Sequence, residues 1–505
     1  MHQEQTVTTT LVERLIDAFN REKIVYSHWK SNIALALATA GEQDLDLIVD
    51  RKSLPSALAV LSRLGFKAAV IRRGANPPGI QHYYGFDPDT KHLIHVHLFS
   101  IVLTGESYVK SHLFPFEAML LENIYYVDHM RVTARPAELV LFTLRMFIKY
   151  GSLLDLGTLW RKSESIKTEI CWLQEGDDLS EALSLLKKYC PVIDEPLFVR
   201  CVETLNSNSP LITRMRLAQQ VRQRLQVYAR HTFFKRLLAN GQMLWAEVQR
   251  RLETKQKNKV LQAGGAVIAF VGADATGKST LVTETERWLG STFAVRRVHA
   301  GKPPSTWLTA PLNLFLPLIR RSLSSLRTNR LEGHSASNHA EPSPNKNKGV
   351  ASLVYALRAV ILAWERRQLL VRARRATVNG EFVICDRYPS DTIGIMDSPR
   401  LCEQPTSRGI VPVIFNRLAR LEQQLYRQIP PPDIVLRLNV SIETALQRNR
   451  ERLKPGKETD IYIASRHRQT REWRKDGAKY VYDIDTEQSL AETINCVKSA
   501  IWESL

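Results

Sequence analysis

A glycine-rich segment in the second half of the chain restricts the fold more than any other feature. Residues 272–279 read G-A-D-A-T-G-K-S and match the phosphate-loop pattern G-x-x-x-x-G-K-[ST] at every fixed position. The apolar stretch 266–271 before it predicts a buried strand, and Thr280-Leu281-Val282 begins a helical pattern. This strand–loop–helix order predicts a parallel α/β sheet, and a chance glycine-rich turn is the alternative.

The residue types in this loop suit the binding of nucleotide phosphates. Gly272 and Gly277 let the backbone wrap so that its N–H groups face phosphate oxygens. We expect Lys278 to reach the β- and γ-phosphates of ATP and the Ser279 hydroxyl to bind Mg²⁺. The predicted ATP-binding residues are Gly272, Ala273, Asp274, Ala275, Thr276, Gly277, Lys278, Ser279 and Thr280.

Two later segments add charged groups of the kind that phosphoryl transfer needs. A predicted buried strand, 382–386, ends in Asp386, which we expect to hold Mg²⁺ through water or to accept a proton. We expect the next residue, Arg387, to bind a phosphate through two hydrogen bonds. A basic run follows another predicted strand, 434–440, and predicts a lid over the transferring group. Its cations are Arg448, Arg450, Arg452, Lys454 and Lys457. The alternative for Asp386-Arg387-Tyr388 is a surface turn, and the alternative for the basic run is a solvated group of charges.

Together these motifs resemble the thymidylate kinase family of nucleoside monophosphate kinases over about residues 266–505. The phosphate loop, Asp386-Arg387-Tyr388 after a strand, and the stretch 432–452 carry the resemblance. It implies a five-stranded parallel sheet wrapped by helices and transfer of the ATP γ-phosphate to a nucleoside monophosphate, normally dTMP.

The same resemblance implies roles for single residues. Asp274 would lie near the acceptor, and Arg387 would grip the acceptor phosphate. Position 275 is Ala, where some members carry a catalytic arginine, so the charge would come from the lid, as in the other branch of the family. The lid candidates are Arg448, Arg450 and Arg452.

Three stretches depart from the family pattern. Members carry Arg-Glu-Pro-Gly after the second strand, whereas residues 298–304 here read V-H-A-G-K-P-P, so Lys302 or Arg297 would have to replace the arginine. The segment 328–348 is an insertion rich in Ser, Asn, His and Pro that we expect to be disordered. Residues 396–400, M-D-S-P-R, differ near the place of the acceptor.

The N-terminal half carries a second candidate site. Asp44 and Asp46 are two residues apart, so on a strand they share a face on which they would hold Mg²⁺. With His28-Trp29-Lys30 upstream, this resembles the nucleotidyltransferase fold over residues 8–130. His95 stands where a third carboxylate is expected, which favours binding without catalysis. Exposed turn carboxylates are the alternative, and a zinc pair of His95 and His97 is disfavoured because no further ligands follow at zinc spacing.

We therefore expect three regions: a nucleotidyltransferase-like α+β domain over 1–130, a helical accessory region and linker over 131–260, and an α/β phosphate-loop kinase domain over 261–505. The first should contain strands at 24–29 and 45–49 and a hairpin of 80–86 with 93–99. In the second, Leu179, Leu183, Leu186 and Cys190 recur at helical spacing, and about 214–259 reads as a long basic helix.

Charge and composition bear on the partners. Seventy Lys and Arg against 51 Asp and Glu give a net charge of +19, which indicates an acidic partner or a solvated basic surface. Six scattered cysteines, a polar N-terminus and no long apolar run predict a cytoplasmic protein without disulfides, signal peptide or spanning helix. Nucleic acid is not expected, because no binding signature appears. Apolar stretches at 312–319 and 353–364 are each followed by arginines, and we expect buried helices of the kinase domain, with peripheral membrane contact as the alternative.

Three functions follow. The first is an ATP- and Mg²⁺-dependent phosphotransferase acting on a dTMP-like acceptor. The second is a bifunctional enzyme of surface-polysaccharide metabolism acting on a sugar or nucleotide-sugar, and the third is a nucleotide-gated binding module.

Overall fold

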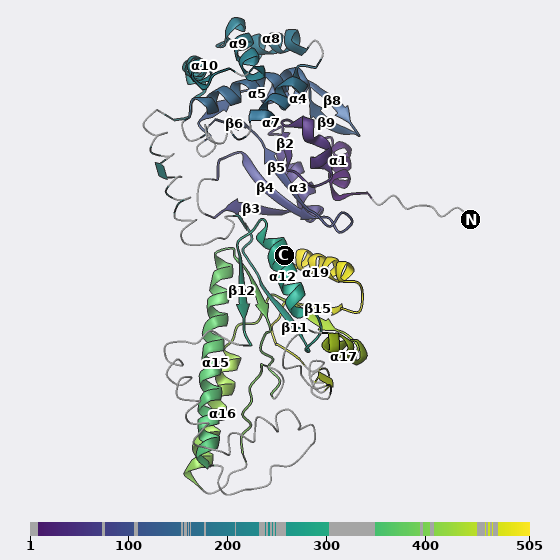
Figure 1. Cartoon of the computed structure of the whole chain (residues 1–505), viewed down its shortest axis with the longest axis vertical. Helices are drawn as coiled ribbons and strands as arrows, with labels where there is room; N and C mark the ends of the chain where they lie inside the picture. The colour runs from purple at the N-terminus through teal and green to yellow at the C-terminus, as the bar shows by residue number, and fades with distance from the viewer. Residues whose placement is uncertain are drawn as a thin grey trace, which may run out of the picture. The chain divides into compact units, whose positions relative to one another are not determined.

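The computed structural model of the chain divides into two compact units, 1–255 and 256–505 (Figure 1). It describes residues 9–72, 76–105, 110–152, 155, 159, 161, 163–175, 178–207, 209–231, 238, 241–242, 245, 248, 259–301, 349–393, 397–404, 409–451, 460, 463–464, 467 and 473–505. The first unit holds both the predicted α+β region and the predicted helical region.

A mixed sheet forms the first part of the N-terminal unit, with its strands in the order β3-β4-β5-β2-β1-β9-β8. The strands are β1 (Tyr26–His28), β2 (Leu45–Val49), β3 (Lys67–Ile71), β4 (Ile80–Phe86), β5 (Leu93–Phe99), β8 (Ile124–Val127) and β9 (Met130–Thr133), and β6 (Val102–Thr104) pairs with β7 (His112–Phe114). The predicted hairpin is confirmed: β4 and β5 are antiparallel, with Ile80 opposite Phe99. The strand expected at 24–29 is shorter than predicted.

Helices make up the remainder of this unit. They are α1 (Leu11–Arg21), α2 (Leu35–Thr39), α3 (Leu54–Arg63), α4 (Glu117–Glu122), α5 (Arg135–Tyr150), α7 (Ser163–Leu173), α8 (Asp178–Tyr189), α9 (Glu195–Asn206) and α10 (Leu211–Arg224), with 3-10 turns at Asn32–Ala34 and Leu225–Tyr228. Helix α5 is buried along almost its whole length and is the centre on which α7 to α10 pack.

Of two predictions about these helices, the helical spacing of 179–190 is confirmed and the long basic helix is not. Leu186 and Cys190 are buried and Leu179 and Leu183 pack against the same core, as their spacing predicted. The long basic helix predicted from about residue 214 is wrong in its described part, because α10 ends at Arg224. A 3-10 turn follows there, and its C-cap residue, Ala229, is extended, which stops the helical hydrogen-bond ladder.

A five-stranded parallel sheet forms the centre of the C-terminal unit, in the order β12-β13-β11-β14-β15. Its strands are β11 (Val267–Gly272), β12 (Val295–His299), β13 (Phe382–Asp386), β14 (Ile434–Asn439) and β15 (Tyr480–Asp485), and the short strand β10 (Lys259–Leu261) precedes them. The predicted parallel sheet is therefore confirmed. Strands β11 and β13 are buried at every residue, as expected when helices cover both faces.

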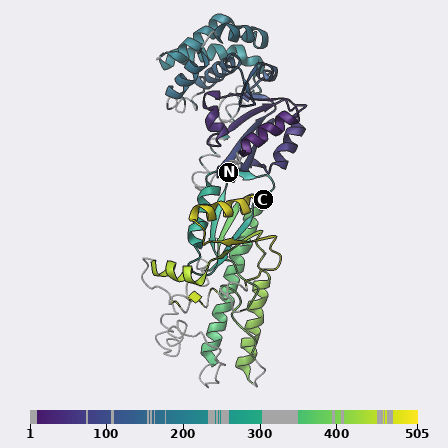
Figure 2. The same ribbon diagram turned by 90° about the vertical axis from the view of Figure 1, so that its right-hand side faces the viewer.

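The helices of this unit are α12 (Lys278–Gly290), α15 (Gly349–Val378), α16 (Ile410–Arg427), α17 (Ile442–Glu451) and α19 (Leu490–Ser504). One face of the sheet packs its β11 and β13 side chains against Leu370 and Ala373 of α15. Helices α12 and α19 pack against each other through Trp288 and Trp502. Helices α15 and α16 lie side by side (Figure 2).

Several sequence-based expectations lie outside the described residues, among them the insertion at 328–348 and the apolar stretch at 312–319. No helix in the described part of the chain combines the length and apolar character needed to span a bilayer. All six cysteines are free thiols.

Candidate active site

The phosphate loop connects the carboxyl end of β11 to the first turn of α12. Gly272 sits where an added Cβ would lie 3.0 Å from the Leu438 carbonyl oxygen, so a side chain here would crowd the neighbouring strand. Gly277 has φ 83° and immediately precedes α12. Ala275 also has a positive φ, 68°, which is uncommon for a residue with a Cβ and concentrates strain in the loop.

The Lys278 side chain lies back over the loop. Its Nζ donates a hydrogen bond to the Gly272 carbonyl at 2.9 Å and another to the Ala273 carbonyl, and only 7% of the residue is exposed. Thr276 Oγ1 also donates to the Ala273 carbonyl, at 2.9 Å. The ammonium group is thereby held within the loop at the positive end of α12.

Strand β13 brings the second predicted pair to the same edge of the sheet. Asp386 is buried and lies beside Phe270 of β11 and His299 of β12 in the strand register. Its carboxylate is 3.6 Å from the Arg297 guanidinium. Arg387 follows with φ 73°, and its backbone N–H donates to the Phe270 carbonyl at 3.1 Å. The turn after β13 is therefore fixed to the strand that enters the phosphate loop.

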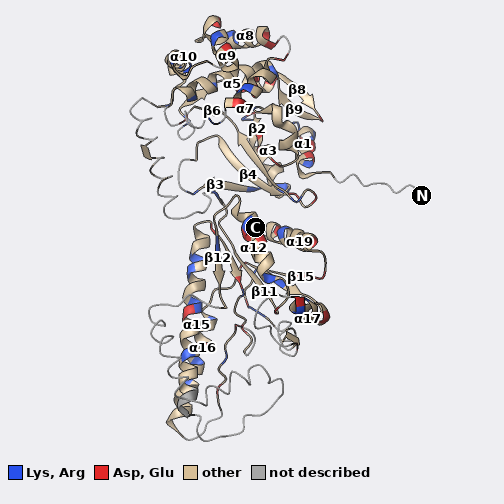
Figure 3. Cartoon of the chain, viewed as in Figure 1, with Lys and Arg blue, Asp and Glu red and all other residues tan. Residues whose placement is uncertain are grey.

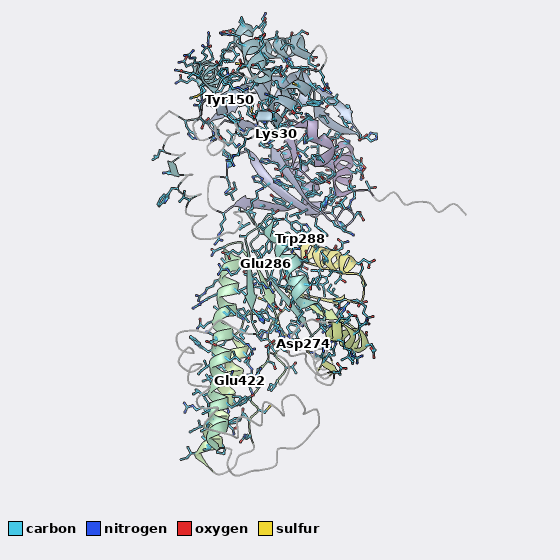
Figure 4. All side chains as sticks on the ribbon, in the orientation of Figure 1. Lys30, Tyr150, Asp274, Glu286, Trp288 and Glu422 are labelled. Carbon is cyan, nitrogen blue, oxygen red and sulfur yellow. The ribbon has the colours of Figure 1, made fainter. Side chains whose placement is uncertain are left out.

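The Arg387 side chain joins the loop to a second carboxylate. Its Nη2 is 3.2 Å from Asp274 Oδ1, and its Nη1 is 3.5 Å from Asp397 Oδ2. Figure 4 marks Asp274 in this unit. The two predicted acceptor-binding residues, Asp274 and Arg387, are thus brought together.

Sequence reasoning missed the residue that fixes Asp397. Arg366 of α15 is 1% exposed, and its Nη2 is 2.7 Å from Asp397 Oδ1. It also donates to the carbonyls of Ala300 at 3.0 Å and Gly301 at 3.2 Å. The available signal was the arginine pair that follows the apolar stretch 353–364, and the departure at 396–400 already included Asp397.

The predicted lid arginines have different surroundings. Arg448 donates to the Thr486 carbonyl at 2.7 Å, beyond the end of β15. Arg450 has a 70% exposed side chain and pairs with Asp460 at 2.9 Å. Arg452 and Lys302 lie outside the described residues, as do Lys454 and Lys457. His467, which the sequence did not single out, donates from Nε2 to the Asp274 carbonyl at 3.0 Å.

The predicted magnesium ligands in this unit offer suitable chemistry. Ser279 lies in the exposed first turn of α12, and Asp386 offers a buried carboxylate at the neighbouring strand end. Hydroxyl and carboxylate oxygens are the donors that Mg²⁺ prefers. These two residues fit a magnesium ion carried in with a nucleotide.

In the N-terminal unit, Asp44 and Asp46 do face histidines on the neighbouring strand. His95 Nδ1 is 2.6 Å from Asp44 Oδ1, and His97 Nδ1 is 3.1 Å from Asp46 Oδ1. Asp46 Oδ1 also lies 2.8 Å from Lys30 Nζ. Burial raises the pKa of Asp46, but the Lys30 charge and the His97 hydrogen bond outweigh it and hold the pKa well below the usual range.

The protonation of His97 and the residues grouped around Asp44 and Asp46 determine whether a metal ion could bind there. Burial lowers the pKa of His97 to about 4, so its ring is neutral at pH 7. Within the described residues, no three His, Cys, Asp or Glu side chains are grouped to hold a metal ion. Asp44 and Asp46 as metal ligands therefore remain a prediction, and one of them already has a lysine as counter-ion.

Comparison with known proteins gives limited likeness. No protein-family model matches the chain. The uncharacterized ATP-binding protein YghS of Escherichia coli K12 is 26% identical over 187 residues, which are 36% of this chain and 72% of YghS. YghR, another uncharacterized ATP-binding protein of the same strain, is 28% identical over 187 residues, 36% of this chain and 68% of YghR.

Two solved structures that resemble the chain over about half its length are a deoxyadenosine kinase and a thymidylate kinase. A deoxyadenosine kinase from M. mycoides is 15% identical, with 47% of this chain and all of that chain covered, at a TM-score of 0.27. A thymidylate kinase from Candida albicans is 16% identical, with 48% of this chain and 92% of that chain covered, also at 0.27. The strand order and the loop described above define the α/β phosphate-loop architecture of the C-terminal unit.

Proposed function

We propose that the C-terminal unit is an ATP- and Mg²⁺-dependent phosphotransferase of the thymidylate kinase type, with a nucleoside monophosphate such as dTMP as acceptor. The observation that carries the proposal is the Arg387–Asp274 contact, which joins the turn after β13 to the phosphate loop. The contact brings Arg387 to the loop that carries Lys278, at the edge of a parallel sheet where ligands of such sheets bind. This supports phosphate-binding roles for both residues. The ATP-binding relatives support the nucleotide.

Each residue then has a defined task. The loop N–H groups and Lys278 bind the β- and γ-phosphates, and the lysine exchanges its carbonyl partners for phosphate oxygens. Ser279 and Asp386 hold Mg²⁺, which supplies charge neutralisation. Arg387 orients the acceptor phosphate in line with the γ-phosphate, so that catalysis consists mainly of positioning and electrostatic stabilisation.

Two arginines are candidates for the acceptor phosphate. Arg387 is paired with carboxylates, and an acceptor phosphate offers a stronger bidentate partner for the same guanidinium. Arg297 on β12 has its Nη2 near the Asp386 carboxylate and its side chain only partly exposed. It takes the place of the arginine that the family pattern puts after the second strand.

The test is phosphoryl transfer from labelled ATP to dTMP, dUMP and simple sugars with the full chain. The Lys278→Ala variant should lose at least a hundredfold in kcat/KM, because the lysine charge acts on the transferring phosphates. Lys479→Ala, which removes an exposed lysine of the same unit, is the matched control and should keep full activity. Undiminished transfer by Lys278→Ala would overturn the assignment.

A second candidate is phosphorylation of a sugar or nucleotide-sugar in surface-polysaccharide metabolism. The observation that favours it is at the end of β12, where His299 leads into Ala300 and Gly301, whose carbonyls bind Arg366 rather than an acceptor. Robust transfer to dTMP in the acceptor screen would exclude this candidate. ATP binding without transfer to any acceptor would instead support a nucleotide-gated binding module.

A further inference from the structure

The stretch M-D-S-P-R at 396–400 departs from the family pattern, and the function proposed above gives it no task. Its described part begins with Asp397, whose side chain is buried. Asp397 Oδ1 lies 2.7 Å from Arg366 Nη2, and its Oδ2 lies 3.5 Å from Arg387 Nη1. One buried carboxylate is therefore shared between a buried arginine and the arginine that we assign to the acceptor phosphate.

Arg366 is not itself available to a ligand. A guanidinium has five N–H donors, and in Arg366 each of them has an acceptor within the protein. The acceptors are the carbonyls of Ala300, Gly301 and Asp397, the Tyr426 hydroxyl and the Asp397 carboxylate. Because every donor is used and the residue is 1% exposed, the Arg366 charge acts at the site through Asp397.

The segment that carries Asp397 is also fixed at its other end. Glu422 of α16 accepts hydrogen bonds on Oε2 from the backbone N–H groups of Arg400 at 3.1 Å and Leu401 at 2.8 Å. Glu422 is buried, and Figure 4 labels it. Arg366 of α15 additionally donates to the backbone carbonyl of Asp397 at 3.2 Å. Buried charged groups from two helices thus hold this short segment, so the carboxylate keeps its place when neighbouring side chains move.

The backbone at both ends of the Asp397–Arg387 contact is strained. Asp397 has φ 67° and Arg387 has φ 73°, which is uncommon for residues with a Cβ. Such conformations persist where surrounding contacts enforce them, and they concentrate at functional sites. Here Arg366 holds the Asp397 carbonyl, and the Phe270 carbonyl accepts from the Arg387 backbone N–H at 3.1 Å. The two side chains therefore meet from enforced backbone positions.

Two carboxylates determine the plane of the Arg387 guanidinium. Asp274 of the phosphate loop contacts Nη2 at 3.2 Å, and Asp397 contacts Nη1 at 3.5 Å. A planar group held at both Nη atoms is restricted in rotation, whereas a group held at one of them is not. The Asp397 contact is the longer, and Arg366 offsets part of the carboxylate charge. Asp397 therefore orients Arg387 without fully neutralising it.

We propose that Asp397, held by Arg366, is a positioning residue that keeps the Arg387 guanidinium oriented toward the phosphate loop for the acceptor phosphate. The inference rests on the phosphotransferase function proposed above and adds these two residues to it. Asp397 acts through Arg387 by restricting it before the acceptor arrives, which reduces the side-chain freedom lost on binding. Misplacing such a group by about 1 Å can cost on the order of a hundredfold in rate.

The experiment measures phosphoryl transfer from ATP to dTMP by the full chain. Asp397→Asn removes the charge, and asparagine tolerates the left-handed backbone of this position. We expect kcat/KM for dTMP to fall about tenfold to a hundredfold, with KM for ATP within about twofold of the wild type. The matched control is Glu403→Gln, which removes a carboxylate of the same segment that pairs with Arg420 and should leave both values unchanged.

A second background shows whether Asp397 acts through Arg387. In a protein that already carries Arg387→Ala, adding Asp397→Asn should lower kcat/KM by less than about twofold, because the group that it positions is gone. The same fold loss in both backgrounds would overturn the proposal, because the carboxylate would then act on the structure alone. Equal kcat/KM for the Asp397→Asn and Glu403→Gln proteins would overturn it too.

A third readout needs no catalytic activity. In protein with nitrogen-15 in its arginines, NMR should show slow rotation about the Cζ–Nη bonds of Arg387 in the wild type and in Glu403→Gln, and faster rotation in Asp397→Asn. The Arg387 signal is the one that disappears in Arg387→Ala. Unchanged rotation in Asp397→Asn would overturn the proposal. The expected NMR difference without any transfer to dTMP would count against the proposed function and support the coupling of Asp397 to Arg387.

Discussion

Replacing Arg366 by Met should destabilise the C-terminal unit more than any substitution of an exposed arginine. Arg366 is 1% exposed and pairs with Asp397, which is itself buried. Helix α15, on which it lies, is marked with its charged residues in Figure 3. Methionine fills a similar volume, so the change removes the charge and the hydrogen bonds without a large cavity.

The expected cost follows from the groups that lose a partner. The Asp397 carboxylate keeps only the weaker contact with Arg387 at 3.5 Å, and the carbonyls of Ala300 and Gly301 lose their donors. Breaking a buried ion pair by removing one member costs about 3–5 kcal/mol, because the other charge stays buried. We expect a loss in that range in the free energy of unfolding.

A double-mutant cycle tests the reasoning. Asp397 has φ 67°, which asparagine tolerates, so Asp397→Asn removes the charge without adding backbone strain. The double variant should be more stable than the sum of the single losses predicts, by about 1–3 kcal/mol. Denaturant titration followed by hydrogen exchange in β13 and α15 reports on this unit alone. Additive losses, or a cost of Arg366→Met below about 1 kcal/mol, would refute the buried-pair argument.

Other perturbations give further tests. Folded Glu138 keeps its proton up to about pH 8, whereas the unfolded chain loses it near pH 4.5. The contribution of Glu138 to the free energy of unfolding should therefore fall as pH rises between these values. The variant Glu138→Gln should remove that slope. Folded Lys149 loses its proton near pH 7, whereas the unfolded chain loses it near pH 10.5. The contribution of Lys149 to the free energy of unfolding should therefore rise over that interval, and a pH series on Lys149→Met should lack the rise. Gly265→Ala should cost several kcal/mol in a denaturant titration, because the new Cβ would lie 1.9 Å from the Glu381 carbonyl oxygen. Gly290→Ala, in open space at the end of α12, is its control and should change stability by less than about 1 kcal/mol.

The sequence alone predicted the strand, loop and helix around Gly272–Ser279, because steric demands of a phosphate loop are local and are met by glycine at fixed positions. It also predicted β13 with Asp386 at its end, since a strand covered on both faces needs a continuous apolar run. The hairpin of β4 and β5 was likewise readable from alternating residues around a turn.

Only the tertiary structure decided which charges meet. Arg366 and Asp397 are 31 residues apart, and nothing in either local pattern shows that one neutralises the other. Lys30 likewise reaches Asp46 because β1 and β2 pair antiparallel, which gives this carboxylate a lysine as counter-ion. Local patterns fix backbone conformation, whereas the electrostatics of a site depend on contacts between segments that folding alone brings together.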